Sequence, residues 1–196
     1  MCYYEHPALR TVSEPVEEIT DEIRTLSEQM IATMRENEGI GLAAPQVGDN
    51  RRFYVIEIPP RPDDEDEDAP CLSPGELALL PKMPMTLINP QLTEFSEYEC
   101  EFVEGCLSIP VLTAPVWRAE FVKLDAQLLD GSHISITCGG LLARCLMHEQ
   151  DHLDGILFID HISDEDYDAM SDDLEAMAKK TDAELRKQAR KRRRQK

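Results

Sequence analysis

The sequence His148-Glu149-Gln150-Asp151-His152 lies inside an apolar run, GLLARCLMHEQDHL, that spans residues 140–153. The run has helical spacing, and residues four positions apart share one face of a helix. His148 and His152 would therefore lie side by side, where two ring nitrogens can hold one metal ion, and Glu149 could reach a water on that ion. The alternative is a helix that carries two histidines by chance. Two histidines do not complete a tetrahedral site, so a third ligand must come from elsewhere.

The composition indicates one globular domain. The chain has 196 residues, of which 42% are hydrophobic, enough to form a sizeable core. No apolar run approaches the roughly 20 residues of a membrane span, and the N-terminus lacks the features of a signal peptide. We therefore expect a cytoplasmic protein with no membrane partner. Its six cysteines include no C-x-x-C pair, and we expect them to be mostly free thiols.

The charge is distributed unevenly. The net charge is −19, but residues 179–196 hold ten basic and two acidic residues, so this tail carries +8 against −27 for the rest of the chain. A basic tail on an acidic body predicts docking on an anionic partner. The alternative is a tail that only increases solubility. The acidic body argues against general nucleic-acid binding by the folded domain.

Periodicity and turn residues predict the order of the elements. A helix begins at the N-cap Thr20 and ends near Gly39. An acidic and proline-rich segment, residues 59–84, is expected to be a partly mobile surface insertion. A β-hairpin is expected around Asp130-Gly131. The other expected strands or core segments are residues 52–58, 86–90, 94–103, 116–128, 133–138 and 156–160. We expect one domain over residues 1–162, and a C-terminal helix with a basic tail, begun by Ser163, over 163–196.

Two further segments contain residues suited to a metal-dependent reaction. GIGLAAPQ at residues 39–46 is rich in small residues that let a backbone approach a ligand, and the amide of Gln46 could donate to an oxyanion. An ordinary loop between a helix and a strand is the alternative. EGCLSIP at residues 104–110 contains Cys106, whose thiolate would complete a Cys-His-His set with one open position. From the residues alone, Cys106 is a ligand or a structural thiol.

Together and in this order, GIGLAAPQ, EGCLS (residues 104–108) and HEQDH resemble the motifs of peptide deformylase. The resemblance covers most of residues 1–162. It implies an α+β fold with a metal-bearing helix packed among antiparallel strands. It also implies a hydrolase that removes the formyl group from the N-terminal formyl-methionine of nascent polypeptides and releases formate. The implied metal is Fe²⁺, with Zn²⁺, Ni²⁺ or Co²⁺ also able to occupy the site.

The resemblance also implies residue roles. Cys106, His148 and His152 would hold the metal. Glu149 would act as general base and then as general acid. The Gln46 amide and the backbone N–H of Leu107 would stabilise the oxyanion. The substrate chain would pair in extended form with backbone in two segments, and the implied substrate-binding residues are Ile40, Gly41, Glu104, Gly105 and Arg144.

Arg144 departs from the family pattern, in which an apolar residue usually lines the methionine pocket. It could shrink or polarise that pocket, or its stem could lie along the pocket while its head reaches solvent or Glu104. Thr113 stands where many bacterial members carry arginine, while Arg118 matches the family pattern. Because of Arg144, one alternative is a deformylase with altered substrate preference. Another is a non-catalytic ribosome-associated protein.

A zinc protease is a further alternative, but Phe158 stands where a metzincin needs its third histidine. The resemblance also implies that residues 186–196 dock on ribosomal RNA at the exit tunnel.

Overall fold

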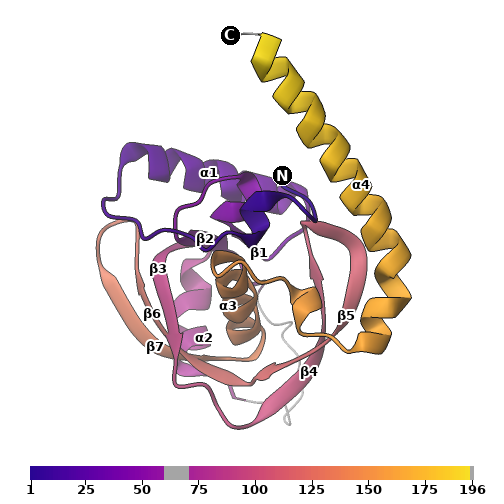
Figure 1. Ribbon diagram of the computed structural model, residues 1–196. Helices are drawn as coiled ribbons and strands as arrows, with labels where there is room; N and C mark the ends of the chain where they lie inside the picture. The colour runs from indigo at the N-terminus through magenta and orange to yellow at the C-terminus, as the bar shows by residue number, and fades with distance from the viewer. Residues whose placement is uncertain (60–70, 195–196) are drawn as a thin grey trace.

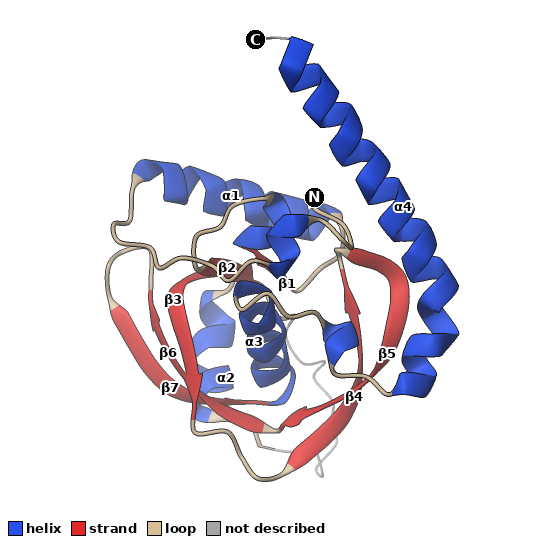
Figure 2. Ribbon diagram, in the orientation of Figure 1, coloured by secondary structure: helices blue, strands red, loops and turns tan. Residues whose placement is uncertain are grey.

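The computed structural model describes residues 1–59 and 71–194, and the chain adopts an α+β fold, as predicted (Figures 1 and 2). An antiparallel sheet has the strand order β1-β2-β3-β6-β7, and β4 and β5 form a separate ribbon. The strands are Gly41–Ala43 (β1), Phe53–Ile56 (β2), Met85–Thr93 (β3), Glu99–Cys106 (β4), Ile109–Ala119 (β5), Phe121–Gln127 (β6) and His133–Gly139 (β7). The α-helices are Asp21–Glu36 (α1), Pro74–Leu79 (α2), Gly140–Leu153 (α3) and Asp164–Arg194 (α4).

Helix α3 lies between the sheet and the β4–β5 ribbon, as Figure 1 shows, and contacts strands of both. It begins at Gly140, whose φ of 56° is a conformation that favours glycine and turns the chain out of β7. Apolar residues on several of its faces are buried in the core, as expected for an enclosed helix. Its buried polar residues, among them Arg144, Glu149 and His152, therefore need partners inside the protein.

The predicted hairpin around Asp130-Gly131 is formed by β6 and β7. The prediction of one strand over residues 116–128 is wrong, because the chain changes partner at Glu120. Ala119, at the end of β5, pairs with Glu99 of the ribbon, whereas Phe121 pairs with Gly139 of the large sheet. This corner links the ribbon to the sheet around α3.

Two other strand predictions are wrong at their ends. β3 does not stop at Pro90 but continues to Thr93, because the pairing with β6 shifts register between Ile88 and Gln91 and so accommodates a residue without an N–H. The strand expected over residues 94–103 begins only at Glu99 and extends to Cys106. Residues 156–160 form no strand; they contain a 3₁₀ helix, Phe158–Asp160, whose apolar residues are buried.

The expected insertion over residues 59–84 is only partly within the described chain, since residues 60–70 lie outside it. The prediction of a surface segment is wrong for its second half. Ser73 and Glu76 form a capping box at the start of α2, and α2 packs against β7. Gly75 lies so close to β7 that a Cβ there would be 2.5 Å from Cys138 Sγ. The helix thus covers one end of the sheet.

The two long terminal helices are predicted well at their starts. Thr20 caps α1 by accepting a hydrogen bond from Ile23 N, and Ser163 accepts one from Asp166 N in α4. Met170 and Leu174 in the first half of α4 are buried against the core. The second half projects beyond the body of the protein (Figure 1). The division of the chain at residue 163 stays a prediction. Of the described helices, none has the length and hydropathy that crossing a membrane requires.

Candidate metal centre

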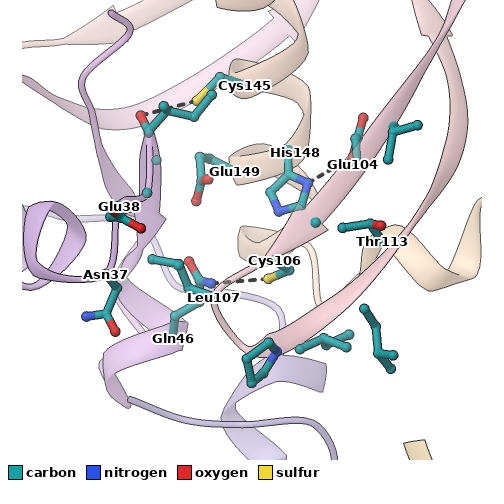
Figure 3. Close-up of a pocket in the computed structure, with 18 of the residues that line it drawn as sticks. Asn37, Glu38, Gln46, Glu104, Cys106, Leu107, Thr113, Cys145, His148 and Glu149 are labelled. Carbon is teal, nitrogen blue, oxygen red and sulfur yellow. Dashed lines mark hydrogen bonds and ion pairs between the residues drawn. The ribbon is translucent and has the colours of Figure 1, made fainter. Parts of the chain in front are cut away.

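Three side chains converge where α3 faces the end of β4, and Figure 3 shows two of them, His148 and Cys106. His148 and His152 come from successive turns of α3, and Cys106 is the last residue of β4. Their ligand atoms all lie within 4.8 Å of one another, and Cys106 Sγ is 3.1 Å from His152 Nε2. Cys106 thus lies where the helix motif requires a third ligand, and the three groups could hold one metal ion.

The chemistry of these atoms fits a divalent transition metal. His148 Nδ1 is held 2.9 Å from Glu104 Oε2, so the other ring nitrogen is the one available to a metal. Burial acts to raise the pKa of Cys106, but the neighbouring His152 and His148 outweigh it and hold this pKa well below its usual value. The thiolate is the form that binds metal. Soft sulfur with two imidazole nitrogens suits Fe²⁺, Zn²⁺, Ni²⁺ or Co²⁺.

Glu104 is the centre of a buried ionic network. It accepts hydrogen bonds from Arg118 at 2.7 and 3.0 Å and from Arg144 Nη1 at 2.9 Å. Burial acts to raise the pKa of Glu104, but hydrogen bonds from His148 and Arg118 outweigh it and keep this pKa below its usual value. The carboxylate therefore stays charged and orients the His148 ring.

Sequence reasoning missed the outward extension of this network. Arg118 also donates to Asp151 Oδ2 at 2.7 Å, and His161 Nε2 lies 2.8 Å from the same oxygen. Asp151 is the fourth residue of HEQDH and lies on α3 between the two histidines. Its place in that motif was the available signal, but nothing in the sequence joins it to Arg118 on β5.

Glu149 is 3% exposed, and its Oε2 has no hydrogen-bond partner within the described chain. Burial raises the pKa of this carboxyl to about 7. Gly41 of β1 leaves it room, since a Cβ at that position would lie 2.3 Å from Glu149 Oε1 and 2.9 Å from Cys145 Sγ. The strand can therefore pass directly over the carboxyl only with glycine here.

The amide of Gln46 is fixed in orientation. Its Oε1 accepts a hydrogen bond from Ala43 N at 2.8 Å, so its NH₂ group faces the centre (Figure 3). Nε2 donates to Ser108 Oγ at 3.1 Å and lies 3.4 Å from Cys106 Sγ. Gln46 thus brings a potential N–H donor to the same site as the sulfur, and Leu107, the residue after Cys106, lines the adjoining cleft.

A cleft of about 530 Å³ opens onto this centre. Its lining includes every residue that was expected to contact substrate: Ile40, Gly41, Glu104, Gly105 and Arg144. Leu107, Thr113 and Leu141 also line the cleft. The guanidinium of Arg144 bonds to Glu104, to Val116 O at 2.8 Å and to Cys100 O at 2.6 Å. The guanidinium is thus paired inside the protein, and of the arrangements expected for Arg144 the one in which its head reaches Glu104 is confirmed.

Comparison with known proteins places these features in one family. The family model for polypeptide deformylase matches residues 1–168. A peptide deformylase of Salinibacter ruber is 42% identical over 160 residues, covering 82% of this chain and 78% of the relative. One from Novosphingobium aromaticivorans is 44% identical over 161 residues, covering 80% and 85%.

Solved structures of peptide deformylases also resemble this chain. The chain resembles Arabidopsis thaliana peptide deformylase 1B with a TM-score of 0.76 and 33% identity, over 93% of this chain and 92% of that one. A peptide deformylase from Synechococcus elongatus, solved in complex with actinonin, gives a TM-score of 0.72 and 37% identity, over 88% and 85%.

Proposed function

The chain belongs to the polypeptide deformylase family, and on that premise we propose that Cys106, His148 and His152 hold one divalent metal ion for its reaction. The protein is a hydrolase that removes the N-formyl group from the formyl-methionine of nascent polypeptides and releases formate. Fe²⁺ is the proposed native ion, with Zn²⁺, Ni²⁺ and Co²⁺ as substitutes. When bound, such an ion polarises a carbonyl and lowers the pKa of water toward about 7.

Glu149 is the proposed general base and acid. It would take the proton of the attacking water and then deliver it to the nitrogen that leaves as the amine of methionine. A pKa of about 7 suits both steps, because the carboxyl can then exist in either form near neutral pH. Glu149 Oε2 supports this role, since a buried carboxylate oxygen that has no partner among residues 1–59 and 71–194 is available to water or substrate.

Gln46 and Leu107 are the proposed donors to the oxyanion that develops on the formyl oxygen. The hydrogen bond from Ala43 N fixes the Gln46 amide with its N–H groups toward Cys106. A donor that is already oriented needs no reorganisation during the reaction. The backbone N–H of Leu107 would supply the second hydrogen bond from the turn after β4.

The substrate chain would lie extended between Ile40-Gly41 on one side and Gly105 on the other, as an added strand. Arg144 would line the methionine pocket with its aliphatic stem only, because its guanidinium bonds to Glu104 and to two backbone carbonyls. The hydrogen bonds of Arg144 support an ordinary preference for methionine. A deformylase with altered preference and a non-catalytic ribosome-associated protein are both less favoured by the family match.

The observation that carries this proposal is a Cys-His-His set beside Glu149, whose Oε2 has no hydrogen-bond partner in the described part of the chain. The test is formate release from formyl-Met-Ala-Ser by protein purified without oxygen and loaded separately with Fe²⁺, Ni²⁺, Co²⁺ or Zn²⁺. A peptide with formyl-alanine in first place runs beside it. Turnover of formyl-methionine by the Fe²⁺ form, lost on exposure to air as the thiolate oxidises, is expected. If the metal-loaded protein released formate from neither peptide, the mechanism would be overturned.

We also propose that the reaction takes place in the cytoplasm and that the basic end of α4 docks on ribosomal RNA. Residues 186–191 lie on the part of α4 that continues away from the body, and their basic side chains are exposed, which would present their charges to phosphates (Figure 1). Replacing Arg186, Lys187, Arg190 and Lys191 by glutamine should weaken ribosome binding at low salt and flatten its salt dependence. Changing only the two arginines to lysine keeps the charge and should preserve binding. Equal binding by both variants would contradict the proposal.

A further inference from the structure

A second hollow, of about 490 Å³, lies beside the catalytic cleft. It is formed between the start of β5 and one face of α4. Tyr3, Pro110, Val111 and Leu112 line both the cleft and this hollow, so the two share a wall. The two spaces are therefore neighbours across one short segment of backbone.

The α4 side of the hollow has an apolar floor and a charged rim. Met177 is partly buried and Thr181 is buried, at the bottom of the helix face. Asp173, Lys180 and Glu184 lie on the same face at helical spacing and are exposed. Two acids against one lysine leave the rim with a negative balance, which favours a basic occupant over an acidic one.

Val111 stands on the wall between the two spaces. Its side chain is 97% exposed, and its φ is 76°. A β-branched residue rarely adopts this conformation, and such strain is found where structure is shaped for a ligand. The result is an apolar side chain that contacts little of its own protein and faces both the cleft and the hollow.

We propose that the second hollow binds later residues of the formylated substrate chain, which cross Val111 on their way out of the catalytic cleft. This rests on the proposed function, because the formyl end must be fixed at the metal centre. An extended chain advances about 3.3 Å per residue, so each further residue must leave the cleft rather than fold back into it. The shared wall gives it a continuous path, and α4 leads from the hollow to the basic tail proposed to face the ribosome (Figure 1).

The first test measures kcat/KM for formyl-Met-Ala-Ser and for the same peptide lengthened stepwise to nine residues. We expect kcat/KM to rise about three- to tenfold once the peptide reaches the hollow, as expected for partial burial of one apolar side chain. Lysine at the distal positions should exceed glutamate. If no formate were released from the three-residue peptide, the proposed function would be rejected. If that peptide were turned over but kcat/KM did not rise with peptide length, only this proposal would be rejected.

Ala176→Trp places a large side chain in the hollow, since Ala176 lines it. We expect this variant to lose the ratio of long-peptide to short-peptide kcat/KM. Ala169→Trp is the matched control, because Ala169 is also exposed on α4 but lies outside both linings. The control should keep the ratio. The same ratio in both variants would contradict the proposal.

A cross-linking experiment does not depend on how the variants fold. A nine-residue substrate with a benzophenone side chain at its seventh residue is irradiated with the metal-loaded protein. Attachment to residues 173–184 of the same chain is expected. Attachment only elsewhere, or bridging to α4 of a second copy, would show that the hollow has a different occupant and would overturn the proposal.

Discussion

Glu104 Oε2 lies 2.9 Å from His148 Nδ1, while the same carboxylate accepts hydrogen bonds from Arg118 and Arg144. The Glu104 carboxylate has two roles in this network. It fixes the ring of His148 with its other nitrogen toward the metal centre, and it forms buried ion pairs with both arginines. The position of a proposed ligand on α3 therefore depends on side chains from the β4–β5 ribbon.

Replacing Glu104 by glutamine should weaken metal binding about 10- to 100-fold, which is the usual effect of losing a partner that orients a histidine ligand. The amide keeps the shape but cannot hold a negative charge beside the ring. Competition with a chromophoric chelator measures the affinity. Glu101→Gln is the control, since Glu101 is exposed on the same strand. Equal affinity in both variants would show that the contact is not needed for binding.

Replacing Glu149 by glutamine should lower kcat about 10²- to 10⁴-fold, the contribution typical of a general acid or base. Metal content should stay the same, because Glu149 is not among the three clustered ligands. Formate release and elemental analysis of the same preparation measure the two quantities. Loss of metal together with activity would instead make Glu149 a structural part of the metal site.

Replacing Arg118 by methionine should lower the free energy of unfolding by about 3 kcal/mol, because it removes the buried cation that Glu104 and Asp151 share. Glu104 would then keep Arg144 as its guanidinium partner. Urea denaturation measures the change. Arg35→Met is the control, since Arg35 pairs with Glu57 on the surface and should cost much less. Similar losses in both variants would mean that burial adds nothing to the Arg118 pairs.

The parts of the fold that the sequence predicted well are those set by local signals. Thr20 and Ser163 start their helices because their hydroxyls accept backbone hydrogen bonds nearby. The Asp130-Gly131 turn likewise defines its hairpin. The failures are non-local. The change of partner at Glu120 and the packing of α2 on β7 depend on contacts between segments far apart in the chain.

In the candidate metal centre too, local spacing was predictable from the sequence and contacts between distant segments were not. Helical spacing was enough to bring His148 and His152 together, and the structure adds Cys106 to them. The residues alone left Cys106 open, because one cysteine among six has no local mark of a ligand. The links from Glu104 to Arg118 and from Asp151 to His161 join β4 to β5 and α3 to the loop before α4, so no spacing rule could predict them.

Stability should fall in acid partly through Asp49, which lies away from the metal centre. Burial acts to raise the pKa of Asp49, but hydrogen bonds from Arg51 outweigh it and hold this pKa below its usual value of 3.8. A lowered folded-state pKa stabilises the protein above the unfolded pKa, and this gain disappears as the pH falls through the folded value. Asp49→Asn should therefore be less stable than the parent at pH 7, and the difference should shrink below pH 4 and disappear as the pH falls through the lowered folded-state pKa. Urea denaturation at several pH values measures it.

Asp168→Asn, at an exposed position on α4, is the control and should show no such convergence. A difference for Asp49→Asn that is the same at every pH would mean that the substitution acts through packing rather than through charge.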